Sequence, residues 1–130
     1  MENKPVLVIY KLFCSISYPL WWLALLIRSF RDKEHKTRYI EKLGKGYKKR
    51  PEGDVIWVHA LGLGETLALT FFLERLSQSF KNKTVLFTSS TLNSYTAFNR
   101  LEMRKNIIYQ FAPIDDYISL RRFLSHWRPS

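Results

Sequence analysis

A glycine-containing loop that ends in a carboxylate is the feature of this sequence best suited to chemistry. It reads His59-Ala60-Leu61-Gly62-Leu63-Gly64-Glu65-Thr66. Glycines at these positions let the backbone turn tightly and let a ligand come close. A carboxylate beside such a loop can serve as a general base. We therefore take Gly62, Gly64 and Glu65 as candidate site residues.

The loop matches neither of two common phosphate-binding patterns. A dinucleotide fingerprint that starts at Gly62 needs a glycine where Leu67 stands, and no Gly-Lys-Ser/Thr comes after it to make a P-loop. Glu65 also has a purely structural interpretation, because free N–H groups stabilise a carboxylate in the first turn of a helix. Both interpretations of Glu65 stay open on position alone.

Other residue types that often mark chemistry give no metal or disulfide site here. His35, His59 and His126 are far apart and lack Cys or carboxylate partners at metal-ligand spacing, so we expect no metal site. Cys14 is the single cysteine, which excludes an intramolecular disulfide. We interpret the adjacent acidic pair at positions 115 and 116 as a helix N-cap.

The elements that must position the loop are predicted from alternating short apolar runs and amphipathic stretches. Strands are predicted at residues 54–59, 84–88 and 107–111, and helices at residues 66–80, 92–104 and 116–127. Three strand-then-helix units predict an α/β domain with a Rossmann-like parallel sheet.

Right-handed crossovers bring the loops after the three strands to one edge of the sheet. These loops are residues 60–65, 89–93 and 112–116, so Ser89 and Ser90 join Glu65 as candidate substrate contacts. The chain stops where a fourth strand is expected, and three parallel strands leave an exposed edge. We therefore expect a domain over residues 54–130 that is truncated before its fourth strand.

An apolar stretch at the N-terminus predicts a retained membrane helix over residues 1–27. Its charge-free part, residues 12–27, is a little shorter than the about 20 residues that span a bilayer, so a spanning helix and an interfacial one both stay open. Pro19 favours a kink near its middle. A buried helix of a soluble protein is the competing interpretation.

Positive charge gathers directly after this stretch. The chain carries a formal charge of +10, and residues 28–50 contain ten basic and three acidic residues. Residues 28–53 are thus expected to form a basic juxtamembrane linker that faces lipid headgroups, and the positive-inside rule places the chain after residue 27 in the cytoplasm. Because the charge lies beside the apolar stretch and no nucleic-acid-binding motif is present, we expect no nucleic acid partner.

The glycine-glutamate loop resembles the His-Ser/Ala-Val-Ser-Val-Gly-Glu loop of transferases of 3-deoxy-D-manno-octulosonic acid (Kdo). His59, Gly64 and Glu65 match that loop, whereas Gly62 replaces the usual serine. The segment Phe111-Ala112-Pro113-Ile114-Asp115 is similar to the family's Tyr-Leu-Pro-Tyr-Asp, and residues 88–94 resemble a threonine-rich family loop. The resemblance extends over essentially the whole chain.

The resemblance implies the acceptor-binding, N-terminal half of a GT-B glycosyltransferase. Glu65 would then be the base that activates a glucosamine hydroxyl of the lipid A precursor (lipid IVA) for attack on CMP-Kdo. CMP-Kdo would be a donor substrate held mainly by a C-terminal half that this chain lacks, with no cofactor or metal. Lys45, Lys48 and Lys49 would contact acceptor phosphates at the cytoplasmic face of the bacterial inner membrane.

Two alternatives compete with this assignment. The chain can be a membrane-tethered, non-catalytic α/β module or remnant, in which Glu65 only starts a helix. It can also be a nucleic-acid-binding domain attracted by its charge, although the position of the basic residues argues against this. By itself, the chain is expected to show no transferase activity.

Overall fold

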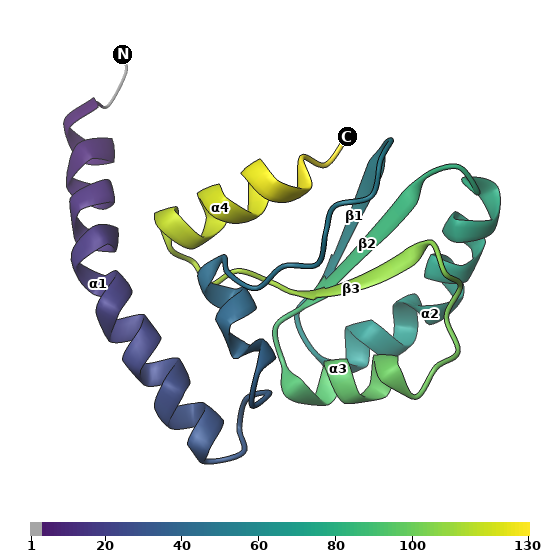
Figure 1. The fold of residues 1–130 in the computed structure, drawn as a ribbon, viewed down its shortest axis with the longest axis horizontal. Coiled ribbons are helices and arrows are strands. Elements are labelled where there is room, and N and C mark those ends of the chain that lie inside the picture. The colour runs from purple at the N-terminus through teal and green to yellow at the C-terminus, as the bar shows by residue number, and fades with distance from the viewer. Residues whose placement is uncertain (1–3) are drawn as a thin grey trace.

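The computed structural model describes residues 4–130 and places a long helix beside a three-stranded sheet that is flanked by helices (Figure 1). The elements in order are α1 (Lys4–Phe30), the 3-10 helix η1 (Arg38–Leu43), β1 (Val55–Ala60), α2 (Leu63–Ser79), β2 (Thr84–Ser89), α3 (Leu92–Asn99), β3 (Ile107–Phe111) and α4 (Tyr117–Trp127). The predicted α/β class and element order are confirmed.

Two helix boundaries differ from the prediction by more than one residue. α2 begins earlier, at Leu63, because Gly62 already accepts the first helical hydrogen bond through its carbonyl, from the N–H of Thr66 at 3.1 Å. α3 ends earlier, at Asn99, where the N–H of Arg100 turns back to carbonyls of the last turn. The predicted end at residue 104 was therefore wrong.

The sheet is parallel throughout, in the order β1-β2-β3. Ala60 pairs with Ser89, and Ser89 pairs with Phe111, so the three strands end level with one another. The loops after the strands therefore share one edge, as expected from right-handed crossovers.

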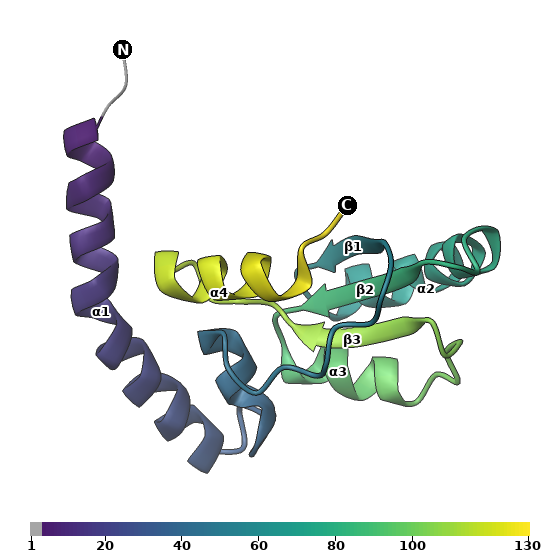
Figure 2. The same ribbon diagram turned by 45° about the horizontal axis from the view of Figure 1, so that its top comes forward.

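Helices cover both faces of the sheet (Figures 1 and 2). α2 and α3 pack Leu73 and Phe98 against Phe87 on one face, while α4 packs Phe123 and Trp127 on the other. Neighbouring strand residues point to opposite faces, so each strand contributes to both layers. This two-sided burial explains why all six residues of β2 are buried.

Helix α1 lies at the end of the domain, against α4 and η1. It is long and apolar enough to cross a membrane, judged by length and composition alone. Figure 2 shows the helix bending partway along, in agreement with the proline at position 19. Most of its large apolar side chains are exposed.

The basic segment after α1 packs onto the sheet through η1. Glu41 Oε2 accepts hydrogen bonds from the backbone N–H of Phe111 at 3.1 Å and from Gln110 Nε2 at 2.8 Å. Arg38 Nη2 donates to the carbonyl of Tyr109 at 3.0 Å and its guanidinium pairs with Glu41. The side chains of Arg38 and Glu41 thus form hydrogen bonds with backbone groups at the outer edge of β3, so this edge is covered rather than exposed.

Candidate functional site

A hollow of about 390 Å³ lies at the carboxyl ends of the strands. All three strand-end loops contribute to it, together with one residue of η1 and one of α1. Its lining consists of His59, Leu61, Ser90, Ala112, Pro113, Ile114, Asp115, Lys42 and Trp21. The position agrees with the general preference of ligands for this edge of parallel sheets.

Glu65 is the third residue of α2 and does not itself line this hollow, although its hydrogen-bond partner Leu61 does. Its Oε2 accepts a hydrogen bond from the backbone N–H of Leu61 at 2.8 Å, which ties the carboxylate to the loop. The side chain is exposed, and Oε1 makes no hydrogen bond within the described residues. Glu65 therefore supports the start of the helix and still presents a free carboxylate oxygen to solvent.

The two loop glycines are not explained by a tight turn. Gly62 has extended backbone angles, with φ of −139°, and Gly64 is helical, so neither needs a positive φ. Apart from the neighbouring residues and the backbone of α2 itself, a Cβ atom at either position would meet no protein atom within 4 Å. The backbone angles of the short connection between β1 and α2 therefore do not require glycine at either position, and open space for an approaching ligand is present beside each.

The two serines of the second loop have different environments. Ser89 is fully buried, and its hydroxyl lies 2.6 Å from the hydroxyl of Tyr109 in the core. In this structure Ser89 cannot contact a ligand, which corrects its place among the candidate contacts. Ser90 does line the hollow, and its backbone carbonyl accepts a hydrogen bond from Lys42 Nζ at 2.8 Å.

Lys42 is a site residue that sequence reasoning missed. Its Nζ lies 2.6 Å from Glu34 Oε2, and the two side chains are only 8% and 3% exposed. Burial lowers the pKa of Lys42, and the ion pair with Glu34 opposes that shift. No regular spacing links the two positions in the sequence, so a local pattern does not reveal the pair.

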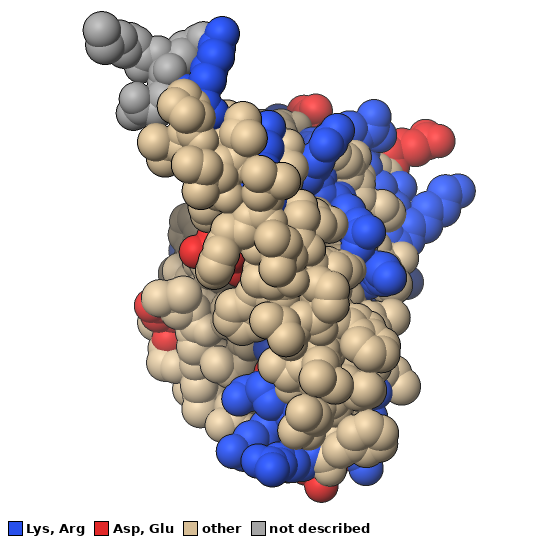
Figure 3. All heavy atoms as spheres, turned by 90° about the vertical axis from the view of Figure 1, so that its left-hand side faces the viewer, with Lys and Arg blue, Asp and Glu red and all other residues tan. Residues whose placement is uncertain are grey.

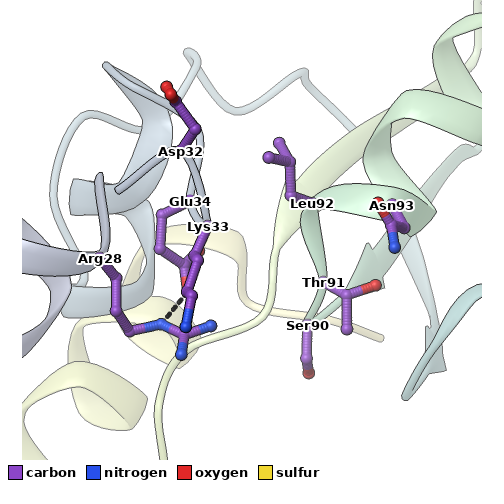
Figure 4. A pocket seen from close by; sticks show the side chains of 8 residues that line it. All are labelled: Arg28, Asp32, Lys33, Glu34, Ser90, Thr91, Leu92 and Asn93. Carbon is purple, nitrogen blue, oxygen red and sulfur yellow. Dashed lines mark hydrogen bonds and ion pairs between the residues drawn. The ribbon is translucent and has the colours of Figure 1, made fainter. Parts of the chain in front are cut away.

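A second hollow of about 320 Å³ meets the first at Ser90. The end of α1 and the residues directly after it form one side of it, where Arg28 Nε pairs with Glu34 Oε1 at 3.0 Å. The other side is the segment from Ser90 to Asn93, in which α3 begins. Figure 4 shows Arg28 and Lys33 lying together across from Ser90. The basic segment thus reaches the loop edge through residues other than those the sequence singled out.

The structure does not bring Lys45, Lys48 and Lys49 to the strand-end loops. All three are exposed, and the carbonyl of Lys48 lies 2.8 Å from His126 Nε2 near the end of α4. The chain then runs on to Arg50, which donates to the carbonyl of Trp127 at 2.6 Å. This path leads away from Glu65, toward the amino end of β1.

Hydrogen bonds hold two further side chains near the strand-end loops. His59 Nδ1 lies 2.9 Å from the hydroxyl of buried Thr88, which also accepts a hydrogen bond from Trp57 Nε1. Asp116 Oδ2 accepts from the backbone N–H of Ser119 at 2.9 Å, so the predicted N-cap is confirmed. Among residues 4–130, no group of three or more His, Cys, Asp or Glu side chains is placed to hold a metal ion.

Comparisons with known proteins show which protein family this chain is similar to. The model of the 3-deoxy-D-manno-octulosonic-acid transferase (kdotransferase) family matches residues 37–130. The probable mitochondrial 3-deoxy-D-manno-octulosonic acid transferase of Arabidopsis thaliana is 31% identical over 125 residues, which cover 94% of this chain and 28% of that protein. The corresponding enzyme of Rickettsia bellii is 26% identical over 121 residues, covering 93% of this chain and 29% of the relative.

The chain therefore spans less than a third of the length of these relatives. No solved structure is significantly similar to it. The family match covers the sheet, the glycine-glutamate loop and the strand-end loops that line the two hollows. It agrees with the resemblance of the glycine-glutamate loop to the loop of this family. On this evidence the chain belongs to the 3-deoxy-D-manno-octulosonic-acid transferase family.

Proposed function

We propose that this chain is the acceptor-side, N-terminal half of a GT-B enzyme that transfers Kdo from CMP-Kdo to lipid IVA, with Glu65 as general base. The observation that supports this best is the exposed carboxylate of Glu65, which is tied through Oε2 to Leu61, a residue that lines the strand-end hollow. A sugar hydroxyl is a poor nucleophile, and a positioned base accelerates such a reaction by roughly 10²–10⁴. In this proposal CMP-Kdo is a donor substrate, and no cofactor or metal takes part.

The surroundings of Glu65 support an acceptor site. The space beside Gly62 and Gly64 lets a sugar ring approach the loop backbone closely. Ser90 offers a side-chain hydroxyl at the junction of the two hollows. Trp21 of the apolar helix α1 lines the same hollow, which suits an acceptor whose lipid part lies in the membrane. Glu65, Gly62, Gly64 and Ser90 are accordingly our proposed site residues.

The enzyme would then act at the cytoplasmic face of a bacterial inner membrane. Exposed Lys45, Lys48 and Lys49 suit lipid headgroups better than the sugar-binding hollow, because they lie away from the strand-end loops. Donor contacts would come from the part of the relatives that this chain does not span.

A chimaera tests the role of Glu65. Residues 1–130 would be joined to the remaining part of the Rickettsia bellii enzyme, and Kdo transfer to lipid IVA would be measured. Glu65→Gln keeps an oxygen that accepts from the Leu61 N–H but removes the base, so we expect a loss of roughly 10²–10⁴ in kcat with an intact fold. Glu74→Gln, farther along α2, is the matched control and should stay within about twofold of the parent.

A non-catalytic module is the second candidate, favoured by the hydrogen bond from Leu61 to Glu65. A parent chimaera that transfers no Kdo would support this candidate. If the parent is active and Glu65 only supports the helix start, Glu65→Gln turns over as fast as the parent chimaera. In that case only Glu65→Ala has an effect, because it deletes the accepting oxygen and lowers stability. The two variants together therefore distinguish a role of Glu65 as general base from a role in stabilising the start of α2.

A further inference from the structure

Helix α1 divides lengthwise into a face held by the domain and a face that no other described residue covers. Cys14, Leu25 and Ser29 are buried against the domain. On the same side, Lys11 Nζ lies 4.9 Å from the centre of the Tyr117 ring, and the hydroxyl of Tyr18 accepts from Arg122 Nη1 at 2.6 Å. These five residues of α1 lie along one side of the helix, since they are separated by three, four or seven positions.

The opposite side of α1 is a continuous apolar stripe. Its members are 45–81% exposed and succeed one another at intervals of three and four residues: Val6, Ile9, Phe13, Ile16, Leu20, Leu23, Ile27 and Phe30. At about 1.5 Å per residue the stripe is about 36 Å long. The charged residues of the helix, Lys4, Lys11 and Arg28, all lie outside it.

The domain lies alongside the helix rather than beyond its end. The contact of Lys11 with Tyr117 and the ion pair of Arg28 with Glu34 are separated by 17 helical residues, or about 25 Å. The hydrocarbon core of a bilayer is only about 30 Å thick. A crossing α1 in this arrangement would carry α4 and η1 into the bilayer, with Arg122 among the buried charges.

We infer that α1 lies in the plane of the membrane, with its apolar stripe in the acyl boundary and the domain on the water side. Interfacial helices of this kind bury an apolar face and keep polar groups outward. Both ends of α1 are then on the same side of the bilayer. This inference goes beyond the proposed reaction and holds whether or not Glu65 is a base.

A lipid surface fits the stripe better than a second copy of the chain. Coiled-coil seams are narrow and are flanked by charged positions, whereas the stripe is flanked by the exposed side chains of Leu12 and Tyr10. Aromatic side chains of this type favour the membrane interface. Figure 3 shows a broad uncharged band on this side of the molecule, with Lys and Arg gathered on its right-hand side and at its lower end and a few Asp and Glu on its left-hand side. Those cations suit anionic headgroups.

Two adjacent residues near the middle of α1 provide the test. Ile16 belongs to the stripe, whereas Ser15 is exposed beside it and donates to the carbonyl of Lys11. Binding of the whole chain to vesicles of phosphatidylcholine and phosphatidylglycerol would be measured by sedimentation. Ile16→Glu should weaken binding by about tenfold, and Ser15→Glu by no more than about twofold. Equal losses, as for a crossing helix, or no loss in either variant, would overturn the inference.

Sidedness gives an independent readout in sealed inner-membrane vesicles. In a Cys14→Ser background, Pro5→Cys and Lys45→Cys would each be treated with a membrane-impermeant maleimide. An in-plane helix predicts that both positions react from the same side, and labelling from opposite sides would contradict it. If Ile16→Glu instead dissolved a dimer and left vesicle binding intact, the stripe would be an interface between copies, which would also overturn the inference.

Discussion

At the scale of single residues, local signals located the caps but not the buried partners. Asp116 could be predicted as an N-cap because capping depends on residues three positions apart. Glu65 could be placed at a helix start for the same reason. Ser89 could not be separated from Ser90, because its burial depends on Tyr109, twenty positions away. The partners of Lys42 are likewise set by the fold.

The buried pair of Lys42 and Glu34 leads to the first residue-scale prediction. Lys42→Met leaves the Glu34 carboxylate buried with only Arg28 beside it, so we expect the free energy of unfolding to fall by about 3 kcal/mol. Urea denaturation in mild detergent, monitored by tryptophan fluorescence, measures this change.

Two control variants make this experiment specific. Lys36→Met breaks an exposed pair with Asp32 and should leave the unfolding midpoint nearly unchanged. Adding Glu34→Gln to Lys42→Met removes the unpaired charge and should recover part of the loss. If Lys42→Met and Lys36→Met were equally mild, the buried pair would contribute little to stability.

At the scale of elements, periodicity predicted the strands and the covering helices but not η1. Strands and amphipathic helices are visible in the local spacing of apolar residues. The 3-10 helix is short and charged, so its sequence resembled a solvated linker. It is held by Arg38 and Glu41, which bind backbone groups of β3 about seventy positions away. Only the assembled sheet provides those partners.

The start of η1 predicts a dependence of stability on pH. His35 Nδ1 accepts hydrogen bonds from the backbone N–H groups of Thr37 and Arg38, at 3.3 and 3.1 Å, which only the neutral ring can do. Burial, together with the charge of Arg38, lowers the pKa of His35 below its ordinary value of 6.5. The unfolded chain therefore binds the proton more tightly, and the contribution of His35 is lost as the pH falls below 6.5.

His35→Asn tests this contribution. The asparagine oxygen can accept from the same backbone groups but does not titrate in this range. The free energy of unfolding would be measured from about pH 7.5 to about pH 5 for both proteins. We expect the parent to lose more stability than the variant across that interval. Parallel curves would show that His35 does not carry this pH dependence.

At the scale of the whole molecule, the two edges of the sheet differ in a way that the sequence did not show. The α/β class could be predicted from three strand-helix units, and one exposed edge was expected. At β3 that edge is covered by η1. At β1, the N–H of Ser130 donates to the carbonyl of Val55 at 2.8 Å, so the chain after α4 already runs to the β1 side.

This asymmetry predicts different rates of amide hydrogen exchange at the two edges. The carbonyl of Asp54 points toward β2, because it accepts a hydrogen bond from the N–H of Thr84. Backbone N–H and carbonyl groups of successive residues point alternately to the two sides of a parallel strand, so those of residues 55, 57 and 59 point away from β2. The N–H of Phe111 instead donates to Glu41. A hydrogen bond to a charged group contributes about 1.5–3 kcal/mol, so Phe111 should exchange about tenfold to a hundredfold more slowly than His59.

Exchange measured by NMR also distinguishes where a further strand would join. Glu41→Ala should speed exchange at Phe111 and leave Trp57 and His59 unchanged, since it opens the β3 edge alone. In any longer protein that carries this sequence, a right-handed crossover through α4 brings the next strand beside β1. The amides of Trp57 and His59 should then become protected, while that of Phe111 stays as it is. If amides of β3 became protected instead, η1 would be displaced by the next strand. The ion pair of Arg38 with Glu41 would then only occupy the place of that strand.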